Sequence, residues 1–92
     1  MKIYITDEVI YDRMEASKYN GGAPTVHKTM KDAIECVKDT VAEWNEHLSE
    51  PLKLGENDGE KWADRRYDED GTYAVVEDCD CFRKVEIFER EV

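Results

Sequence analysis

The clearest pattern in the chain is an apolar stripe within residues 30–48. Its members recur every three or four positions, as on one face of an α-helix, and they are Met30, Ile34, Val37, Val41, Trp44 and Leu48. Thr29 is a suitable N-cap residue, and Pro51 closes the pattern because a residue before proline is disfavoured in a helix. The pattern therefore predicts one amphipathic helix over residues 30–48, with its stripe laid on a sheet.

Alternating apolar and polar residues predict β-strands at both ends of the chain. Lys2–Thr6 alternates in β-favouring residues, and further strands are expected near Lys61–Tyr67, at Thr72–Glu77 and at Cys81–Arg90. Asp68–Gly71 has the composition of a tight turn between two of these strands. The strands predict an antiparallel sheet for the helix to cover.

Residues 7–19 fit two interpretations. A short helix would place Asp7 and Glu8 in its first turn, where the helix dipole favours negative charge. Alternatively, the first strand continues through Val9 and Tyr11. We favour the helix.

Together these elements predict a single α+β domain spanning residues 1–92. We expect one long amphipathic helix packed on a three- to four-stranded antiparallel sheet, with a short second helix near the N-terminus if residues 7–19 are helical. A domain of this size buries only about 60–65% of the surface that its unfolded chain exposes. This leaves little apolar surface for a deep substrate pocket.

The chain is strongly acidic, with 23 Asp and Glu residues against 13 Lys and Arg residues and a formal net charge of −10. A surface that binds nucleic acid directly gathers Lys and Arg, whereas this charge repels polyanions and attracts basic surfaces. The charge therefore argues against direct nucleic-acid binding and favours a basic partner.

The sequence also indicates where the protein works. Its three cysteines are an odd number, and no apolar leader stretch follows Met1, which together favour a reduced, intracellular setting. No run approaches the ~18–20 apolar residues of a membrane span. We therefore expect a cytoplasmic protein without a membrane anchor.

Two acidic loops share part of the pattern of a calcium-binding EF-hand. The first ligand position would be Arg66 in one alignment and Leu54 in the other, and neither side chain suits calcium. Cys79 and Cys81 are separated by one residue, which is too close for the spacer of a structural zinc pair. The sequence therefore predicts no metal site and no cofactor, and it leaves open whether the two cysteines have a redox role.

No established catalytic motif occurs in the chain. Carboxylates are abundant, but a general acid needs a shielded cleft that shifts its pKa, and the sequence singles out no such pair. We therefore predict no catalytic residues and a protein that works by binding.

Ten acidic residues are the predicted partner-binding residues. Five of them recur along one side of the predicted helix and are called the acidic row below: Asp32, Glu35, Asp39, Glu43 and Glu46. The other five lie in predicted loops and turns: Glu56, Asp58, Asp68, Glu69 and Asp70. Like charges at helical spacing cost roughly 0.2–0.5 kcal/mol per pair, so helix stability alone does not favour the acidic row.

In its size, its acidity, the acidic row and the acidic turns, the chain resembles the small phage-encoded anti-CRISPR inhibitors that act as DNA mimics. The resemblance implies a basic nucleic-acid-binding partner, such as a CRISPR effector, in the cytoplasm of a bacterial host. It also implies inhibition of a nuclease complex by occupation of its basic DNA-binding surface. The apolar stripe is too short to require a coiled coil, so we expect a monomer or a weak homodimer.

Two alternatives remain at this stage. In the first, the protein is a small interaction or regulatory subunit that binds through aromatic residues on an exposed sheet face, namely Trp62, Tyr67 and Tyr73. In the second, it is an enzyme that uses some of its carboxylates.

Overall fold

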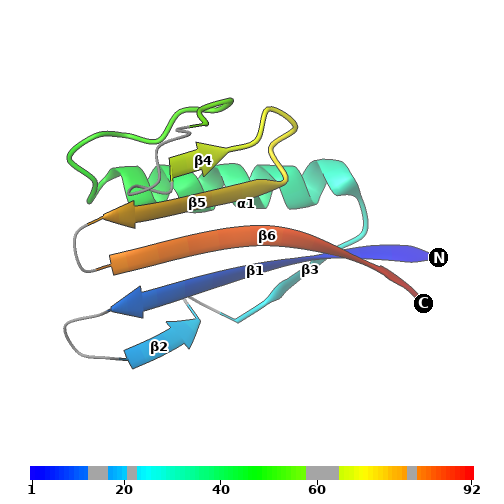
Figure 1. Ribbon diagram of the computed structural model, residues 1–92. Coiled ribbons are helices and arrows are strands. Elements are labelled where there is room, and N and C mark those ends of the chain that lie inside the picture. Colours follow the sequence, from blue (N-terminus) through cyan, green and yellow to red (C-terminus); the bar gives the residue numbers. More distant parts are fainter. Residues whose placement is uncertain (13–16, 21–22, 58–64, 79–80) are drawn as a thin grey trace.

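A computed structural model describes residues 1–12, 17–20, 23–57, 65–78 and 81–92. Its elements are β1 (Lys2–Asp12), β2 (Ser17–Asn20), β3 (Thr25–His27), α1 (Met30–Asn45), β4 (Arg65–Tyr67), β5 (Tyr73–Asp78) and β6 (Cys81–Glu91). The strands form one antiparallel sheet in the order β2-β1-β6-β5-β4, and β3 pairs with β1 as well. The helix α1 packs on one face of this sheet (Figure 1), so the predicted α+β class is confirmed.

The predicted short helix over residues 7–19 is wrong for the part that the structure describes. Asp7–Asp12 continues β1, and Ser17–Asn20 forms β2; residues 13–16 lie outside the described residues. Along its whole length β1 pairs with β6, which bonds the backbone groups on one edge of β1, while β2 and β3 pair with its other edge. This distant partner outweighs the local helix-start signal, and the sheet has more strands than the three or four predicted.

The helix begins at Met30 as predicted and ends at Asn45, three residues before the predicted end at Leu48. The Thr29 hydroxyl accepts a hydrogen bond from the Asp32 backbone N–H at 3.1 Å, which is the expected N-cap. The Asn45 side chain then bonds both backbone groups of Leu52, at 2.8 Å and 3.1 Å. These hydrogen bonds hold the segment that follows the helix against the end of α1.

The core lies between α1 and the sheet. It contains Ala33, Val37, Val41, Trp44, Leu48, Leu52, Tyr67, Ala74, Val76 and Val85 among its buried residues. The Trp44 indole N–H also donates a hydrogen bond to the Glu8 carboxylate on β1. Because directly paired residues point to the same side of a sheet, the pairs Ala74↔Val85 and Glu8↔Val85 mark the face that α1 covers.

The opposite face of the sheet, turned away from α1, is called the open face below. Figure 1 views the molecule from this side, with α1 behind the strands. The register assigns to the open face Ile3, Ile5, Asp7, Val9, Tyr11, Val26, Arg66, Tyr73, Val75, Glu77, Phe82, Lys84, Glu86, Phe88 and Arg90. The face therefore mixes apolar and aromatic side chains with three acidic and three basic ones.

The start of β1 and the end of β6 extend beyond β5 as an arm (Figure 1), and β3 pairs with β1 along part of it. The pairing of β5 with β6 stops at Tyr73↔Glu86, whereas β1 pairs with β6 as far as Lys2↔Glu91. Lys2 and Glu89 form an ion pair at 3.3 Å along the arm. Among the described strands, only β1 pairs with β6 beyond Glu86.

Candidate partner-binding surfaces

The acidic row lies on the side of α1 that faces away from the sheet. All five of its residues are exposed, whereas Ala33, Val37, Val41 and Trp44 on the opposite side of the helix are buried. A rigid element thus presents the five carboxylates to solvent in one line. The structure places this part of the predicted site as the helical spacing indicated.

The helix dipole favours Asp32 in the first turn of α1, but it does not explain the part of the acidic row near the end of the helix. Within the described residues, none of its carboxylates forms an ion pair. Glu43 lies in the last turn of α1 and Glu46 is the C-cap, and no basic residue stands in that turn. A carboxylate at a helix C-terminus is disfavoured by the helix dipole by about 0.3–1 kcal/mol.

The acidic residues of the loops have local structural partners. Glu56 binds Arg65 at 2.7 Å, and Asp68 binds Arg66 at 2.6 Å. Asp70 accepts two hydrogen bonds from Thr72, which lower the pKa of its carboxyl. Unlike the acidic row, these carboxylates help to shape the chain around β4.

The two other predicted loop residues differ from these. Glu69 is exposed in the turn before β5, and Asp58 lies outside the described residues. The structure therefore separates the predicted site into an exposed helical part and a part that is mostly engaged within the fold.

The Glu56–Arg65 pair predicts a pH dependence of stability. The hydrogen bond from Arg65 lowers the pKa of Glu56 below its ordinary value, so the ionised form favours the folded state. This stability is fully present above the ordinary glutamate pKa and is lost as the pH falls through the lower pKa of the folded state. Denaturant unfolding from about pH 7 to about pH 3 should therefore show a smaller acid-induced loss for Glu56→Gln than for the unmodified protein.

The matched control is Glu50→Gln, because Glu50 is exposed and its side chain forms no ion pair in the described part of the chain. Its pH profile should follow that of the unmodified protein. Identical profiles for Glu56→Gln and Glu50→Gln would contradict the assignment.

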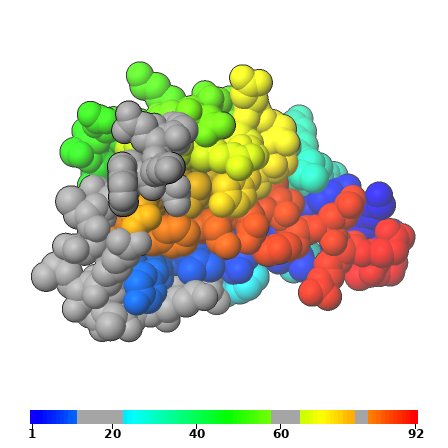
Figure 2. All heavy atoms as spheres, viewed as in Figure 1, coloured from blue at the N-terminus to red at the C-terminus, as the bar shows by residue number. Residues whose placement is uncertain are grey.

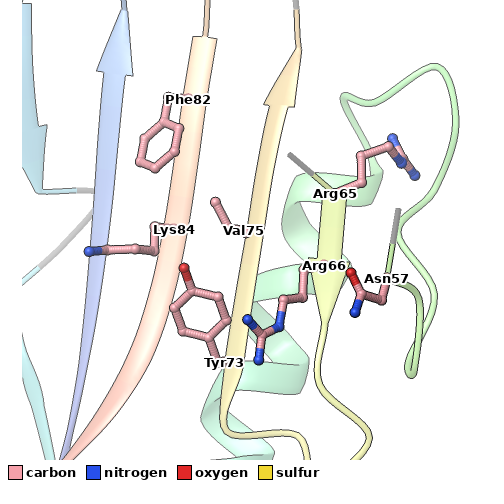
Figure 3. Close-up of a pocket in the computed structure, with 7 residues that line it drawn as sticks. All are labelled: Asn57, Arg65, Arg66, Tyr73, Val75, Phe82 and Lys84. Carbon is pink, nitrogen blue, oxygen red and sulfur yellow. The ribbon is translucent and has the colours of Figure 1, made fainter. Parts of the chain in front are cut away.

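A second surface feature is a shallow hollow on the open face between β4, β5 and β6. Its volume is about 450 Å³, and Figure 3 shows its lining residues Asn57, Arg65, Arg66, Tyr73, Val75, Phe82 and Lys84. The Arg66 guanidinium stands 5.3 Å from the centre of the Tyr73 ring, a cation–π contact. Lys84 binds Glu86 at 3.2 Å. The hollow thus combines aromatic surface with cations that already have carboxylate partners.

The predicted aromatic surface is only partly placed on this face. Tyr73 lies on the open face, but Tyr67 is 6% exposed and belongs to the core. The reason is its pairing with Ala74, which turns Tyr67 toward α1, and burial raises the pKa of its hydroxyl. Trp62 lies outside the described residues. The prediction that Tyr67 is exposed is therefore wrong.

A small polar group lies between α1 and the sheet. The Thr6 hydroxyl is 3.2 Å from both His27 Nε2 and Cys36 Sγ, beside a hollow of about 130 Å³. In the described ranges, no group of three or more His, Cys, Asp or Glu residues is arranged to hold a metal ion. Cys81 is a free, half-buried thiol, and Cys79 lies outside those ranges.

No known protein family, curated protein or solved structure matches this chain. Among the described residues, no helix has the length and apolar character needed to cross a membrane. The acidic row and the hollow on the open face are therefore the two surfaces that bear on function.

An apolar cluster on the open face was not predicted from the sequence. Val26, Ile5 and Phe88 lie side by side there, because Ile5 pairs with Val26 on one side and with Phe88 on the other. The alternation that continues from Ile3 to Tyr11 was the available signal. The strand β1 that this alternation forms is as long as β6. Two long alternating strands of equal length indicate a pair at the centre of a sheet.

Proposed function

We propose that this protein is a non-enzymatic inhibitor of a bacterial nuclease complex, of the anti-CRISPR kind, and that its acidic row occupies a basic DNA-binding surface of that complex. The observation that carries the proposal is the line of five exposed carboxylates on the outer side of α1. The helix is anchored to the sheet by a buried apolar side, so the charges are held in a fixed arrangement.

The spacing of these charges suits a mimic of nucleic acid. Asp32 and Glu46 bound the acidic row, and at ~1.5 Å per residue they lie about 21 Å apart along the helix axis. Duplex DNA carries one charge per ~3.4 Å along each strand, so five carboxylates over this length approach the charge density of one strand. A basic groove built for phosphates would attract them without any base contact.

The test is competition with DNA for purified CRISPR effectors and restriction complexes. We expect the protein to lower DNA binding by its target and to lose potency steeply as salt is raised, because screening weakens attraction between exposed charges. The triple variant Glu35→Gln/Asp39→Asn/Glu43→Gln should inhibit about 10- to 100-fold less well, the range expected when several charge contacts are lost.

The matched control removes three carboxylates elsewhere, in Glu50→Gln/Glu89→Gln/Glu91→Gln, all at exposed positions. It has the same net charge as the triple variant and should keep most of the potency. Equal losses in the two variants would show that bulk charge, and not the acidic row, is responsible. Inhibition unchanged between low and high salt would rule out electrostatic mimicry.

A second candidate function is a non-catalytic interaction subunit that binds through the aromatic hollow. The observation that favours it is the grouping of Tyr73 and Phe82 with Arg66 in one depression, since aromatic and arginine side chains dominate many binding surfaces. In that case Tyr73→Ala would abolish partner binding with the fold intact, and the acidic-row variant would bind normally.

A further inference from the structure

An apolar patch lies on the open face near the arm. Val26 is 61% exposed and Phe88 is 45% exposed, and both are paired with Ile5 between them. Ile3 continues the patch toward the tip of the arm. In Figure 2 the end of β6, coloured red, projects from the body beside the start of β1. These apolar side chains are neighbours on three strands, which makes the patch a candidate interaction surface.

Charged residues bracket this patch symmetrically along the strands. Arg90 lies two residues beyond Phe88 on β6, and Glu86 lies two residues before it. All three are on the open face, because the register pairs Arg90 with Ile3 and Glu86 with Asp7. Glu86 also pairs with Lys84 at 3.2 Å, so the end at Asp7 and Glu86 keeps one net negative charge, against the positive charge of Arg90 at the same distance on the other side of Phe88.

Asp7 adds an independent observation at the negative end. Its Oδ1 atom is buried and has no hydrogen-bond partner among the described residues. A buried carboxylate oxygen without a donor is unfavourable, and such groups in native proteins call for an explanation. Arg90 is exposed, and no ion pair links it to another described residue. Because the Asp7 Oδ1 atom is already covered by its own chain, a second copy would meet only the negative charge of this carboxylate, which lies beside Glu86 at the end opposite Arg90.

We propose that a second copy of this chain docks on the patch, open face to open face, about a twofold axis that passes beside Ile5 and Phe88. A twofold contact is self-complementary, so each residue meets its mirror position in the other copy. The rotation brings Phe88 against the partner's Phe88 and Arg90 against the partner's Glu86 and Asp7. Both ends of the patch are then matched in charge at once.

The fold accommodates this arrangement. Strands of β6 from the two copies run antiparallel across the interface, and aligned sheets pack about 10 Å apart. The helix lies on the other face of each sheet, so both acidic rows remain outside and accessible. The dimer goes beyond the proposed inhibition and does not depend on it.

The patch is small for an interface. The patch is roughly 10–15 Å wide, because it spans three strands that lie ~4.8 Å apart. It is about 17 Å long, because it spans about five residues of ~3.3 Å each along the strands. A standard interface removes about 800 Å² from each partner, so the contact is that of a weak, concentration-dependent dimer. Each copy carries a net charge of −10, and salt screens both their repulsion and the attraction between Arg90 and the partner's Glu86, so these two effects oppose each other.

The experiment is analytical ultracentrifugation of the full chain over a range of concentrations, at low and high salt. The apparent mass should rise from 10.7 kDa toward twice that value with concentration. R90E and E86R each place like charges at both ends of the interface and should weaken dimerisation by about tenfold or more. An equimolar mixture of R90E and E86R should dimerise again, because each variant then meets opposite charges on its partner.

Two further variants make the test decisive. Phe88→Asp alters an exposed side chain, so it should leave the circular dichroism spectrum unchanged and abolish the dimer. Lys31→Glu makes the same charge change as R90E at an exposed position of α1 and should leave the mass distribution unchanged. A chain that stays monomeric at every concentration and salt, or a dimer that persists in Phe88→Asp, would overturn the proposal. Failure of the mixture to recover would overturn the twofold charge pairing.

Discussion

Replacing Trp44 with alanine is expected to lower the free energy of unfolding by ~3–5 kcal/mol, the usual loss for a large aromatic side chain in a core. Trp44 is 3% exposed and lies in the core cluster near the end of α1. Its removal leaves a cavity between helix and sheet. It also removes the hydrogen bond to the Glu8 carboxylate, which is then left without this donor.

Chemical denaturation followed by far-ultraviolet circular dichroism measures this loss. Trp44→Phe keeps much of the apolar surface but removes the N–H donor and one ring of the indole, and we expect it to cost about 1–3 kcal/mol, less than Trp44→Ala. Met30→Ala is the control, because Met30 belongs to the same apolar stripe but is 36% exposed. A loss for Trp44→Ala no larger than that for Met30→Ala would mean that the helix is not anchored as described.

Replacing Gly71 with alanine is expected to cost ~2–3 kcal/mol of stability. Gly71 has φ of +77°, a left-handed conformation that costs a residue with a side chain about 1–2 kcal/mol. An added Cβ would also come within 2.9 Å of Ile34 Cγ2 on α1, so the turn or the helix must shift. Overpacking of this kind typically adds about 1 kcal/mol or more.

Gly55 provides the comparison, because its φ is +82° but an added Cβ would meet only the flexible Glu69 side chain, at 3.2 Å. Gly55→Ala should therefore show the backbone cost alone. The difference between the two alanine variants, measured by denaturant unfolding, reports the close approach of the β4–β5 turn to α1. Equal losses would indicate that Ile34 moves aside freely.

The parts of the fold that follow from short-range patterns could be predicted from the sequence. The period of the apolar stripe identified α1 and its buried side, and the same period placed the acidic row outside. Alternation over Thr72–Glu77 likewise predicted a strand, and β5 lies there with Ala74 and Val76 on one face and Tyr73 and Val75 on the other. In each case the pattern depends on residues that are close in sequence, within one or two helical turns or a few residues of one strand.

The errors arose where a distant partner decides the structure. Thr6, Asp7 and Glu8 carry good signals for a helix start, yet pairing with β6 keeps them in a strand. Tyr67 could not be oriented before its pairing with Ala74 was known. The patch of the open face has the same origin, because Val26 and Phe88 come together only through β1.

The pairing of β1 with β6 also shapes how the chain reaches its fold. These two strands lie at the centre of the sheet, but every other element separates them in sequence. The helix and the β5–β6 hairpin can form from nearby residues, whereas the central pair requires the closure of a loop that contains almost the whole chain. Until that closure, β1 has only the short strands β2 and β3 beside it, and its edge that pairs with β6 stays uncovered. We therefore expect the rate of folding, and the exposure of the chain to aggregation on the way, to be governed by this one late encounter.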